Sequence, residues 1–314
     1  MQISYYKRIA IDDNQWNKCI DESVNGVVYA YSWYLDIVSP NWSALIGDDY
    51  DYIFPLPEFK RVGVDVLLQP VLNQQLGLIS RKHINGEVLN EFIHIIQQEY
   101  GYVNIHLNTL NNFSINNAFY ERTTYQLDLI SNYNQIQSRY SQNTRRNNLK
   151  AIALGVRVDR RVNVNDFLDF YRCNNAVRFS PAMHKRVELV VEVLLSRGLG
   201  DIVGAYINDT LCAAAFMVRS NGKLIYLFAS SSPLGLKSRA MFAIVDQIIR
   251  WNAESHYVFD FEGSMIPSVA RFYAGFGAQP CPYPHIIFDR LPWHASIIFS
   301  ARNLWHWLIN RVTK

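Results

Sequence analysis

The chain has 314 residues, 49% of them hydrophobic, which is enough apolar material for two cores of ordinary domain size. The formal net charge of +3 excludes a surface that attracts polyanions everywhere, and the lack of any run of 18 apolar residues predicts no transmembrane helix. The four cysteines lack metal-ligand spacing and the N-terminus lacks a signal-peptide core, so we expect a cytoplasmic protein without disulfides or structural zinc.

The first 131 residues predict a mixture of helices and strands. Apolar residues between Trp16 and Leu35 indicate a helix followed by a shorter one. Alternating and helical spacings then predict strands at 42–46, 52–56 and 62–66, a helix over 89–100, and strands at 103–107 and 125–129. Because no Gly-rich or Lys-Ser/Thr phosphate loop occurs here, we interpret this half as acceptor-binding or structural.

Residues 132–155 form the segment with the strongest charge bias. No Asp or Glu occurs between Asp128 and Asp159, whereas Arg139, Arg146 and Lys150 fall on one helical stripe. The apolar residues of the segment share faces of the predicted helix, first Tyr133, Ile136 and Tyr140, then Leu149, Ile152 and Ala153, and Gly155 ends it.

Arginine side chains match the geometry of phosphate groups. Arg145, Arg146 and Lys150 are therefore candidates to bind a diphosphate or the backbone of a tRNA. The alternative is a solvated charged face with some ion pairs to the other half of the chain.

The stretch 223–288 predicts a strand–helix–strand unit. An apolar run at 224–228 indicates a strand, apolar residues at 241–249 follow helical spacing, and 257–261 indicates a second strand. At this length we expect parallel strands and a right-handed crossover. The loop before the helix presents backbone N–H groups at a positive helix end, which suits phosphate or an oxyanion. A last strand, His285–Phe288, closes the unit.

The motifs Asp260-Phe261-Glu262-Gly263 and Arg271-Phe272-Tyr273-Ala274-Gly275-Phe276-Gly277-Ala278, with Ser141-Gln142-Asn143-Thr144-Arg145-Arg146-Asn147, carry a family resemblance. They resemble the Fem-type (FemAB-like) and BioF2-type branch of the GNAT acyltransferases, well over 132–290 and more loosely over the first 130 residues. The resemblance implies an α/β (α+β) fold of two tandem GNAT-like halves with mixed sheets flanked by helices. It also implies transfer of an acyl group from a thioester (acyl-CoA, such as acetyl-CoA), or of an aminoacyl group from charged tRNA, to an amine.

Acyl transfer needs a base for the amine proton and a proton for the leaving group. Asp260 and Glu262 are candidate bases, because residues two apart on a strand point to the same face; the alternative is that Asp260 caps the following loop. Tyr273 matches the tyrosine that protonates the leaving thiolate in many GNAT enzymes. Fem members that bridge peptidoglycan tend to have a lysine in its place.

Donor binding is assigned to the loop after the first strand of this unit. Ser230 and Ser231 are candidate oxyanion donors, and Gly235 is the glycine left from the usual acyl-CoA loop. Lys237 and Arg239 are candidates to meet a phosphate or a tRNA 3′-end, with plain surface charges as the alternative.

Trp33 matches a substrate-contacting tryptophan of Fem-type enzymes, and its alternative is an ordinary core aromatic. The histidines lack metal spacing, so we expect no metal. Residues 291–314 predict an aromatic, basic amphipathic helix that packs on the protein or on a second copy, with peripheral contact at the inner face of the membrane as the alternative.

We therefore predict a GNAT-like half at 1–131, a second at 132–290 and the helix at 291–314. The cleft is expected between the two halves, lined by Trp33 and the candidate residues of the second half. The predicted function is N-acyl transfer to a small-molecule or nucleotide-sugar-like acceptor, such as a cell-envelope or polysaccharide precursor. The alternative is a non-catalytic binding or assembly protein that keeps the GNAT fold. The oligomeric state stays open.

Overall fold

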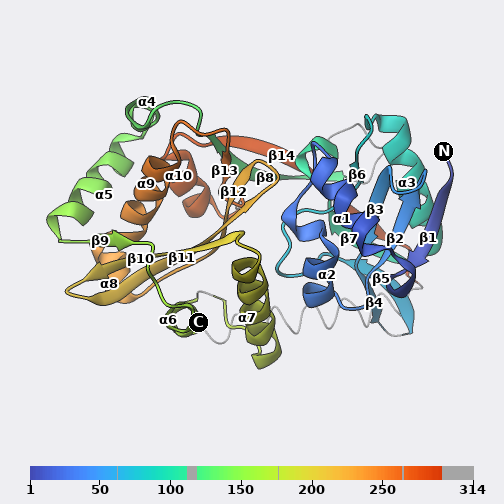
Figure 1. Ribbon diagram of the computed structural model, residues 1–314, viewed down its shortest axis with the longest axis horizontal. Helices are drawn as coiled ribbons and strands as arrows, with labels where there is room; N and C mark the ends of the chain where they lie inside the picture. Colours follow the sequence, from blue (N-terminus) through green and yellow to red (C-terminus); the bar gives the residue numbers. More distant parts are fainter. Residues whose placement is uncertain (62, 112–118, 176, 264, 292–314) are drawn as a thin grey trace. The chain divides into compact units, whose positions relative to one another are not determined.

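The computed structural model describes residues 1–61, 63–111, 119–175, 177–263 and 265–291 (Figure 1). The chain forms two compact units, Met1–Arg122 with Tyr283–Lys314, and Thr123–Pro282. The chain therefore passes from the first unit to the second within β8 (Phe119–Asp128) and returns within β14 (Gln279–Asp289).

The first unit contains two sets of paired strands. β1, β2, β3 and β6 form an antiparallel sheet, while β4, β5, β7 and the end of β14 follow one another in a second sheet, in which β5 and β7 are parallel. The bounds are β1 (Ile3–Lys7), α1 (Asp13–Glu22), α2 (Ser32–Val38), β2 (Ser43–Gly47), β3 (Tyr52–Leu56), β4 (Glu58–Arg61), β5 (Val64–Leu68), β6 (Ile79–Ser80), α3 (Gly86–Glu99) and β7 (Tyr102–His106), with short 3-10 turns at Arg8–Ala10, Val28–Ala30 and Thr109–Asn111.

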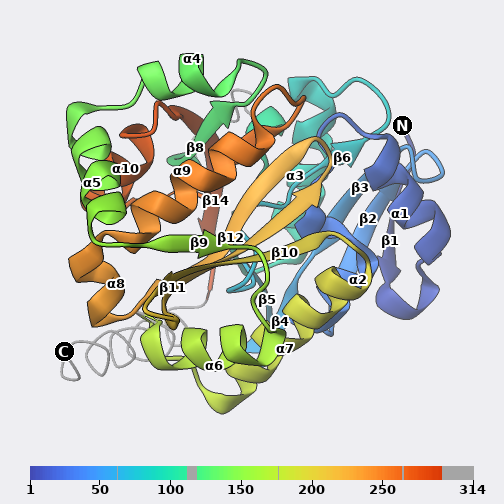
Figure 2. The same ribbon diagram turned by 60° about the vertical axis from the view of Figure 1, so that its left-hand side comes forward.

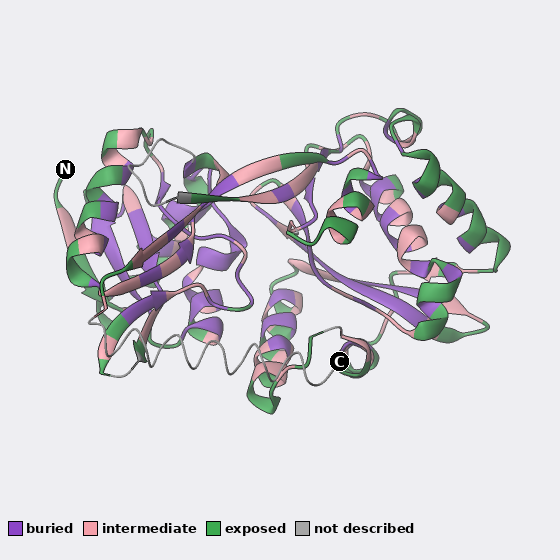
Figure 3. Ribbon diagram, turned by 180° about the vertical axis from the view of Figure 1, so that it is seen from behind, coloured by how far each residue is buried: buried purple, intermediate pink, exposed green. Residues whose placement is uncertain are grey.

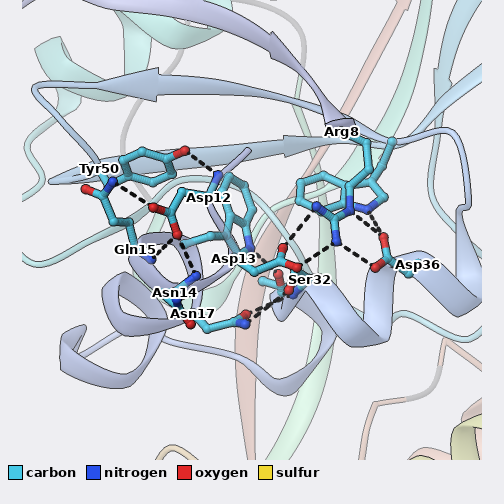
Figure 4. Close-up of polar contacts among 12 residues, drawn as sticks. Arg8, Asp12, Asp13, Asn14, Gln15, Asn17, Ser32, Asp36 and Tyr50 are labelled. Atoms are coloured by element: carbon cyan, nitrogen blue, oxygen red, sulfur yellow. Dashed lines mark hydrogen bonds and ion pairs between the residues drawn. The ribbon is translucent and has the colours of Figure 1, made fainter. Parts of the chain in front are cut away.

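Local chemistry fixes the start of this unit (Figure 4). α1 begins after Asp12, whose carboxylate accepts hydrogen bonds from the backbone N–H groups of Asn14 and Gln15. The Arg8 guanidinium bridges Asp13 on α1 at 3.0 Å and Asp36 on α2 at 2.6 Å. These contacts tie the end of β1 to both helices.

The second unit is a mixed sheet in the order β8-β13-β12-β11-β10-β9. Only β12 and β13 are parallel, and the other described pairs are antiparallel. The bounds are α4 (Tyr133–Ser138), α5 (Gln142–Ala153), β9 (Arg157–Asp159), α6 (Val164–Asn174), α7 (Pro181–Ser196), β10 (Gly200–Ile207), β11 (Thr210–Ser220), β12 (Lys223–Ser231), α8 (Pro233–Ser238), α9 (Ala240–Asn252), β13 (Val258–Asp260) and α10 (Pro267–Ala274).

Side-chain alternation gives the second sheet two packed faces. Ala215 and its alternate neighbours face α9, and α5 packs on α9 (Figure 2). On the other face, Phe216 and Phe228 contact α6 through Phe167 and Tyr171, with ring centroids 5.8 and 5.5 Å apart. Figure 3 shows β11 and β12, the strands that carry Phe216 and Phe228, mostly in the colour of buried residues.

The predicted strand–helix–strand unit is present, and its strands β12 and β13 are parallel as expected. The helix is interrupted, however. A short helix α8 comes first, and Arg239 then adopts a left-handed conformation (φ 62°) before α9 begins.

The last strand belongs elsewhere than the sequence suggests. Residues 283–291 lie in the first unit, where His285 pairs with His106 and Phe288 with Val103 of β7. Ile286 is part of the core under α3, so burial in that core draws the strand away from the second half. The compact units meet at 122/123 and 282/283. The domain limits predicted at 131/132 and 290/291 stay a prediction. The predicted helix at 291–314 lies outside the described residues, apart from Leu291.

α5 also differs from the amphipathic pattern. Thr144, Asn148 and Ala151 are buried, whereas Leu149 and Ile152 are each 68% exposed. α4 ends at Ser138 and α5 starts after the capping residue Ser141, so the two helices do not share one stripe. Small side chains face inward because the backbones approach closely: Ser141 N–H donates to the Gly275 carbonyl at 2.9 Å, and a Cβ on Gly275 would come 2.4 Å from Thr144 Oγ1.

Candidate functional site

Strand β13 pairs with only the first part of the β12 edge that faces it. β12 pairs with β11 from Lys223 to Ser231, but its parallel pairing with β13 stops at Ile225. Phe216 pairs with Phe228 and Met217 with Tyr226, so Leu227 is the extra residue of a β-bulge. Among the described strands, none continues beside Tyr226–Ser231 on the β13 side. An extended ligand with amide groups can therefore hydrogen-bond to this edge.

Ser230 lies on this free stretch. It is 7% exposed, and its hydroxyl oxygen is buried without a hydrogen-bond partner among the described residues. A buried hydroxyl without a partner costs free energy, so the position favours a ligand group that completes the bond. Ser231, the next residue, points to the opposite face by strand alternation.

Tyr273, on α10, is surrounded by aromatic rings. Its ring centroid lies 4.9 Å from that of Phe261, 6.1 Å from Tyr125 and 6.3 Å from Tyr226. Burial raises the pKa of the Tyr273 phenol, and the charges of Glu262 and Asp260 raise it further. The phenol therefore stays protonated at neutral pH, as a proton donor must.

Asp260, the last residue of β13, is engaged on several sides. It is 3% exposed and accepts hydrogen bonds from Thr124 Oγ1 (2.6 Å) and Gln126 Nε2 (2.9 Å). Lys223 Nζ lies 3.4 Å from its carboxylate, and the Glu262 backbone N–H donates to Oδ1 at 3.1 Å. This geometry matches the interpretation that Asp260 fixes the following loop. Its role as catalytic base stays a prediction.

Glu262 lies beyond the end of β13. It adopts a left-handed conformation (φ 57°), so the strand alternation expected for Asp260 and Glu262 does not apply. The negative charge of Glu262 contributes to raising the pKa of both Tyr273 and Tyr171, the latter to about 12, with burial as the larger cause. Glu262 is thus the carboxylate whose charge acts on two buried phenols.

Sequence reasoning missed the tyrosines around Tyr273. These are Tyr125 on β8 and Tyr226 on β12, strands in which tyrosine is a common packing residue. Nothing in the sequence distinguishes them from core aromatics, because only the folded structure brings β8 and β12 next to α10.

In the predicted phosphate loop, the backbone N–H of Gly235 already has a hydrogen-bond partner within the protein. The Gly235 backbone N–H donates to Ser232 Oγ at 3.3 Å, and a Cβ on Gly235 would come 2.0 Å from the Cys212 carbonyl oxygen. Gly235 is therefore needed for the close approach of α8 to β11. Lys237 and Arg239 are exposed on and just after α8. Their contact with a phosphate or a tRNA 3′-end stays a prediction.

Arg145, Arg146 and Lys150 all lie on the exposed side of α5. Arg145 donates to the Ser138 carbonyl and Arg146 to Asn143 Oδ1 at 3.1 Å. None of the three cations forms an ion pair with an acid in the described part of the chain. Their binding of a diphosphate or tRNA also stays a prediction.

Trp33 belongs to the first unit. It is half-buried on α2 and stacks on Tyr31, with ring centroids 5.2 Å apart and planes 21° apart. It is thus no fully buried core residue, and its substrate contact stays a prediction. Within the described residues there is no group of three or more His, Cys, Asp or Glu side chains that could hold a metal. No helix in the same part of the chain is long and apolar enough to cross a membrane.

Comparison with known proteins identifies the fold. Residues 138–265 match the family model of an acetyltransferase (GNAT) domain. The structure is similar to FemX (TM-score 0.64, 11% identity, 91% of this chain and 97% of that one). It is also similar to L-PGS from Bacillus licheniformis (0.53, 12%, 93% and 96%) and to a tandem GNAT protein from the clavulanic acid biosynthesis pathway (0.50, 10%, 93% and 99%). No curated protein sequence matches the chain.

The second unit therefore contains a GNAT domain, and the chain has an acyltransferase fold. Its fold is similar to those of FemX and of a tandem GNAT protein, in agreement with the resemblance of its motifs.

Proposed function

We propose that this protein is an N-acyltransferase that moves an acyl group from a thioester, such as an acyl-CoA, to an amine. The observation that carries the proposal is the buried Tyr273, which lies in the same unit as the stretch of β12 that no described strand pairs on the β13 side. The acceptor is proposed to be an amine-bearing precursor of the cell envelope or of a polysaccharide, and the reaction to take place in the cytoplasm.

The residues fit the acyl end of such a donor. Backbone groups of Tyr226–Ser231 can bond to the amides of an extended pantetheine-like arm. The Ser230 hydroxyl, which has no partner among the described residues, can bond to an acyl oxygen. The phosphate end is less well matched, because the Gly235 N–H already bonds to Ser232. Donor affinity is therefore expected to come mainly from the β12 edge.

Each residue is given its chemical role by the proton that it accepts or donates, or by the group that it positions. Glu262 accepts the proton that the amine nitrogen loses as the new C–N bond forms. Tyr273 donates its proton to the sulfur as the C–S bond breaks. Glu262 then releases its proton to solvent and Tyr273 regains one, which restores both groups. Asp260 positions the Glu262 loop through its hydrogen bond to the Glu262 N–H.

A second candidate function is a binding or assembly role that keeps the fold without turnover. The occupied Gly235 amide favours it, since a degraded phosphate loop is what a protein that has lost its donor would show.

Tyr273→Phe tests the proposal. The variant should lower kcat by ~10²–10⁴-fold while leaving the donor KM and the melting temperature close to those of the parent. Steady-state kinetics with a panel of acyl-CoAs and amines would measure this. Tyr206→Phe, at a half-buried tyrosine of the same unit that has no assigned role, is the control. Equal kcat in Tyr273→Phe and the parent, or no binding of any acyl-CoA, would instead favour the second function.

A further inference from the structure

The outward side of α5 combines apolar and basic side chains. Leu149 and Ile152 are each 68% exposed, and Arg146 and Lys150 lie exposed beside them on the helix. A helix that only packs on its own domain turns such residues inward. Here the inward positions are taken by small and polar side chains, so the leucine and isoleucine serve no core.

α8 repeats this combination. Leu236 is 63% exposed and Leu234 is 41% exposed, and Lys237 is exposed beside them. α5 and α8 both contact α9, and two views show them at the same end of the second unit (Figures 1 and 2). Two separate segments thus place exposed leucines and cations in one region.

The sequence segments that contain the two helices have no Asp or Glu. No Asp or Glu occurs at 129–158 or at 210–245. No described acidic side chain forms an ion pair with Arg146, Lys150 or Lys237. The positive charge is therefore not neutralised locally, which selects an anionic partner.

The apolar side chains decide which anionic partner fits. RNA-binding surfaces pair cations with aromatic rings that stack on bases, and α5 and α8 have no aromatic residue. A bilayer interface takes up aliphatic side chains and cations together, the former among acyl chains and the latter among phosphates.

We propose that α5 and α8 form a membrane-contacting surface, the α5–α8 surface, that binds the headgroup region of a bilayer containing anionic phospholipid. The surface consists of Arg146, Leu149, Lys150, Ile152, Leu236 and Lys237. Apart from Lys237, a candidate for donor binding, it contains none of the residues assigned to acyl transfer. The bilayer takes the place of the tRNA or diphosphate predicted for α5.

Vesicle sedimentation with the full chain tests this surface. Vesicles of phosphatidylcholine with about 30 mol% phosphatidylglycerol contain enough anionic lipid to attract basic segments, so they should bind the protein. Vesicles of phosphatidylcholine alone should bind it far less. Binding should weaken as salt is added. Leu149→Ser/Ile152→Ser and Arg146→Gln/Lys150→Gln should each lower the partition constant about tenfold or more.

The matched control is Lys185→Gln/Leu189→Ser, which changes an exposed cation and an exposed leucine on α7. It should bind vesicles like the parent, and all variants should keep the parental melting temperature. Three outcomes would overturn the proposal: no binding of the parent to anionic vesicles, parental binding by both surface variants, or a dimer that Leu149→Ser/Ile152→Ser dissociates. Binding of tRNA that needs Arg146 and Lys150 but is indifferent to Leu149 and Ile152 would assign the surface to RNA instead.

Discussion

His106 shows how one partly buried side chain links the fold of the first unit to pH. Its Nε2 accepts a hydrogen bond from Arg122 at 2.8 Å, and its Nδ1–H donates to the Gln74 carbonyl at 3.0 Å, so the neutral ring uses both nitrogens. Burial, then the nearby charges of His285 and Arg122, lower the pKa of His106 to about 3. The protonated imidazolium does not fit this arrangement, because its Nε2 could no longer accept the hydrogen bond from Arg122.

The first unit should therefore lose stability as the pH falls. The unfolded chain protonates His106 below about pH 6.5, whereas the folded chain does so only near pH 3, so this stability is complete above 6.5 and is lost on the way down. At pH 5 the loss should be on the order of 1–2 kcal/mol. His106→Asn, which can still donate to Gln74, should flatten the dependence of urea midpoints between pH 7.5 and 5. A parental slope in the variant would assign the acid sensitivity to other groups, such as His285.

The position of helix α8 depends on the absence of a side chain at Gly235. The Gly235 position has no space for a side chain, because a Cβ would come 2.0 Å from the backbone oxygen of Cys212. The same glycine supplies the N–H that Ser232 caps. The glycine of a degraded phosphate loop is thus retained for packing.

Gly235→Ala should consequently displace α8 from β11. We expect a loss of ~1–3 kcal/mol in unfolding free energy, as for other overpacked sites, with a lower melting temperature. Leu236→Ala, on the exposed side of the same helix, should change the melting temperature little. If Gly235→Ala melts like the parent, the close approach of α8 to β11 is not required.

At the scale of the whole molecule, the chain leaves the first unit and later returns to complete it. β14 adds His285–Asp289 to β7, and Ile286, which is 1% exposed, fills the core beneath α3. The N-terminal unit is thus incomplete until nearly the last described residues are in place.

Ile286→Ala should weaken the first unit selectively. Loss of this buried side chain should cost ~2–5 kcal/mol, and hydrogen exchange should speed up in β7 (Tyr102–His106) more than in β11. Ile287→Ala, at a less buried neighbouring position, is the control. Faster exchange in β11 than in β7 would contradict the assignment of this strand to the first unit.

Local patterns determined much of the structure. The apolar spacing of α3 and α9 locates these helices, because a buried stripe is a property of a short segment. The parallel pairing of β12 and β13 follows from the length of the segment between them. The motifs around Glu262 and Tyr273 sufficed to indicate the acyltransferase fold.

The tertiary structure decided which partner each segment meets. β14 reads as a strand in sequence, but only the core beneath α3 makes it part of the first unit. α5 reads as amphipathic, but its close approach to Gly275 admits Thr144 and leaves Leu149 outside. Glu262 follows a strand, but its left-handed backbone turns it away from the strand's alternation. In each case spacing along the chain specifies the local conformation, whereas the choice of packed face and neighbour depends on contacts between residues far apart in sequence.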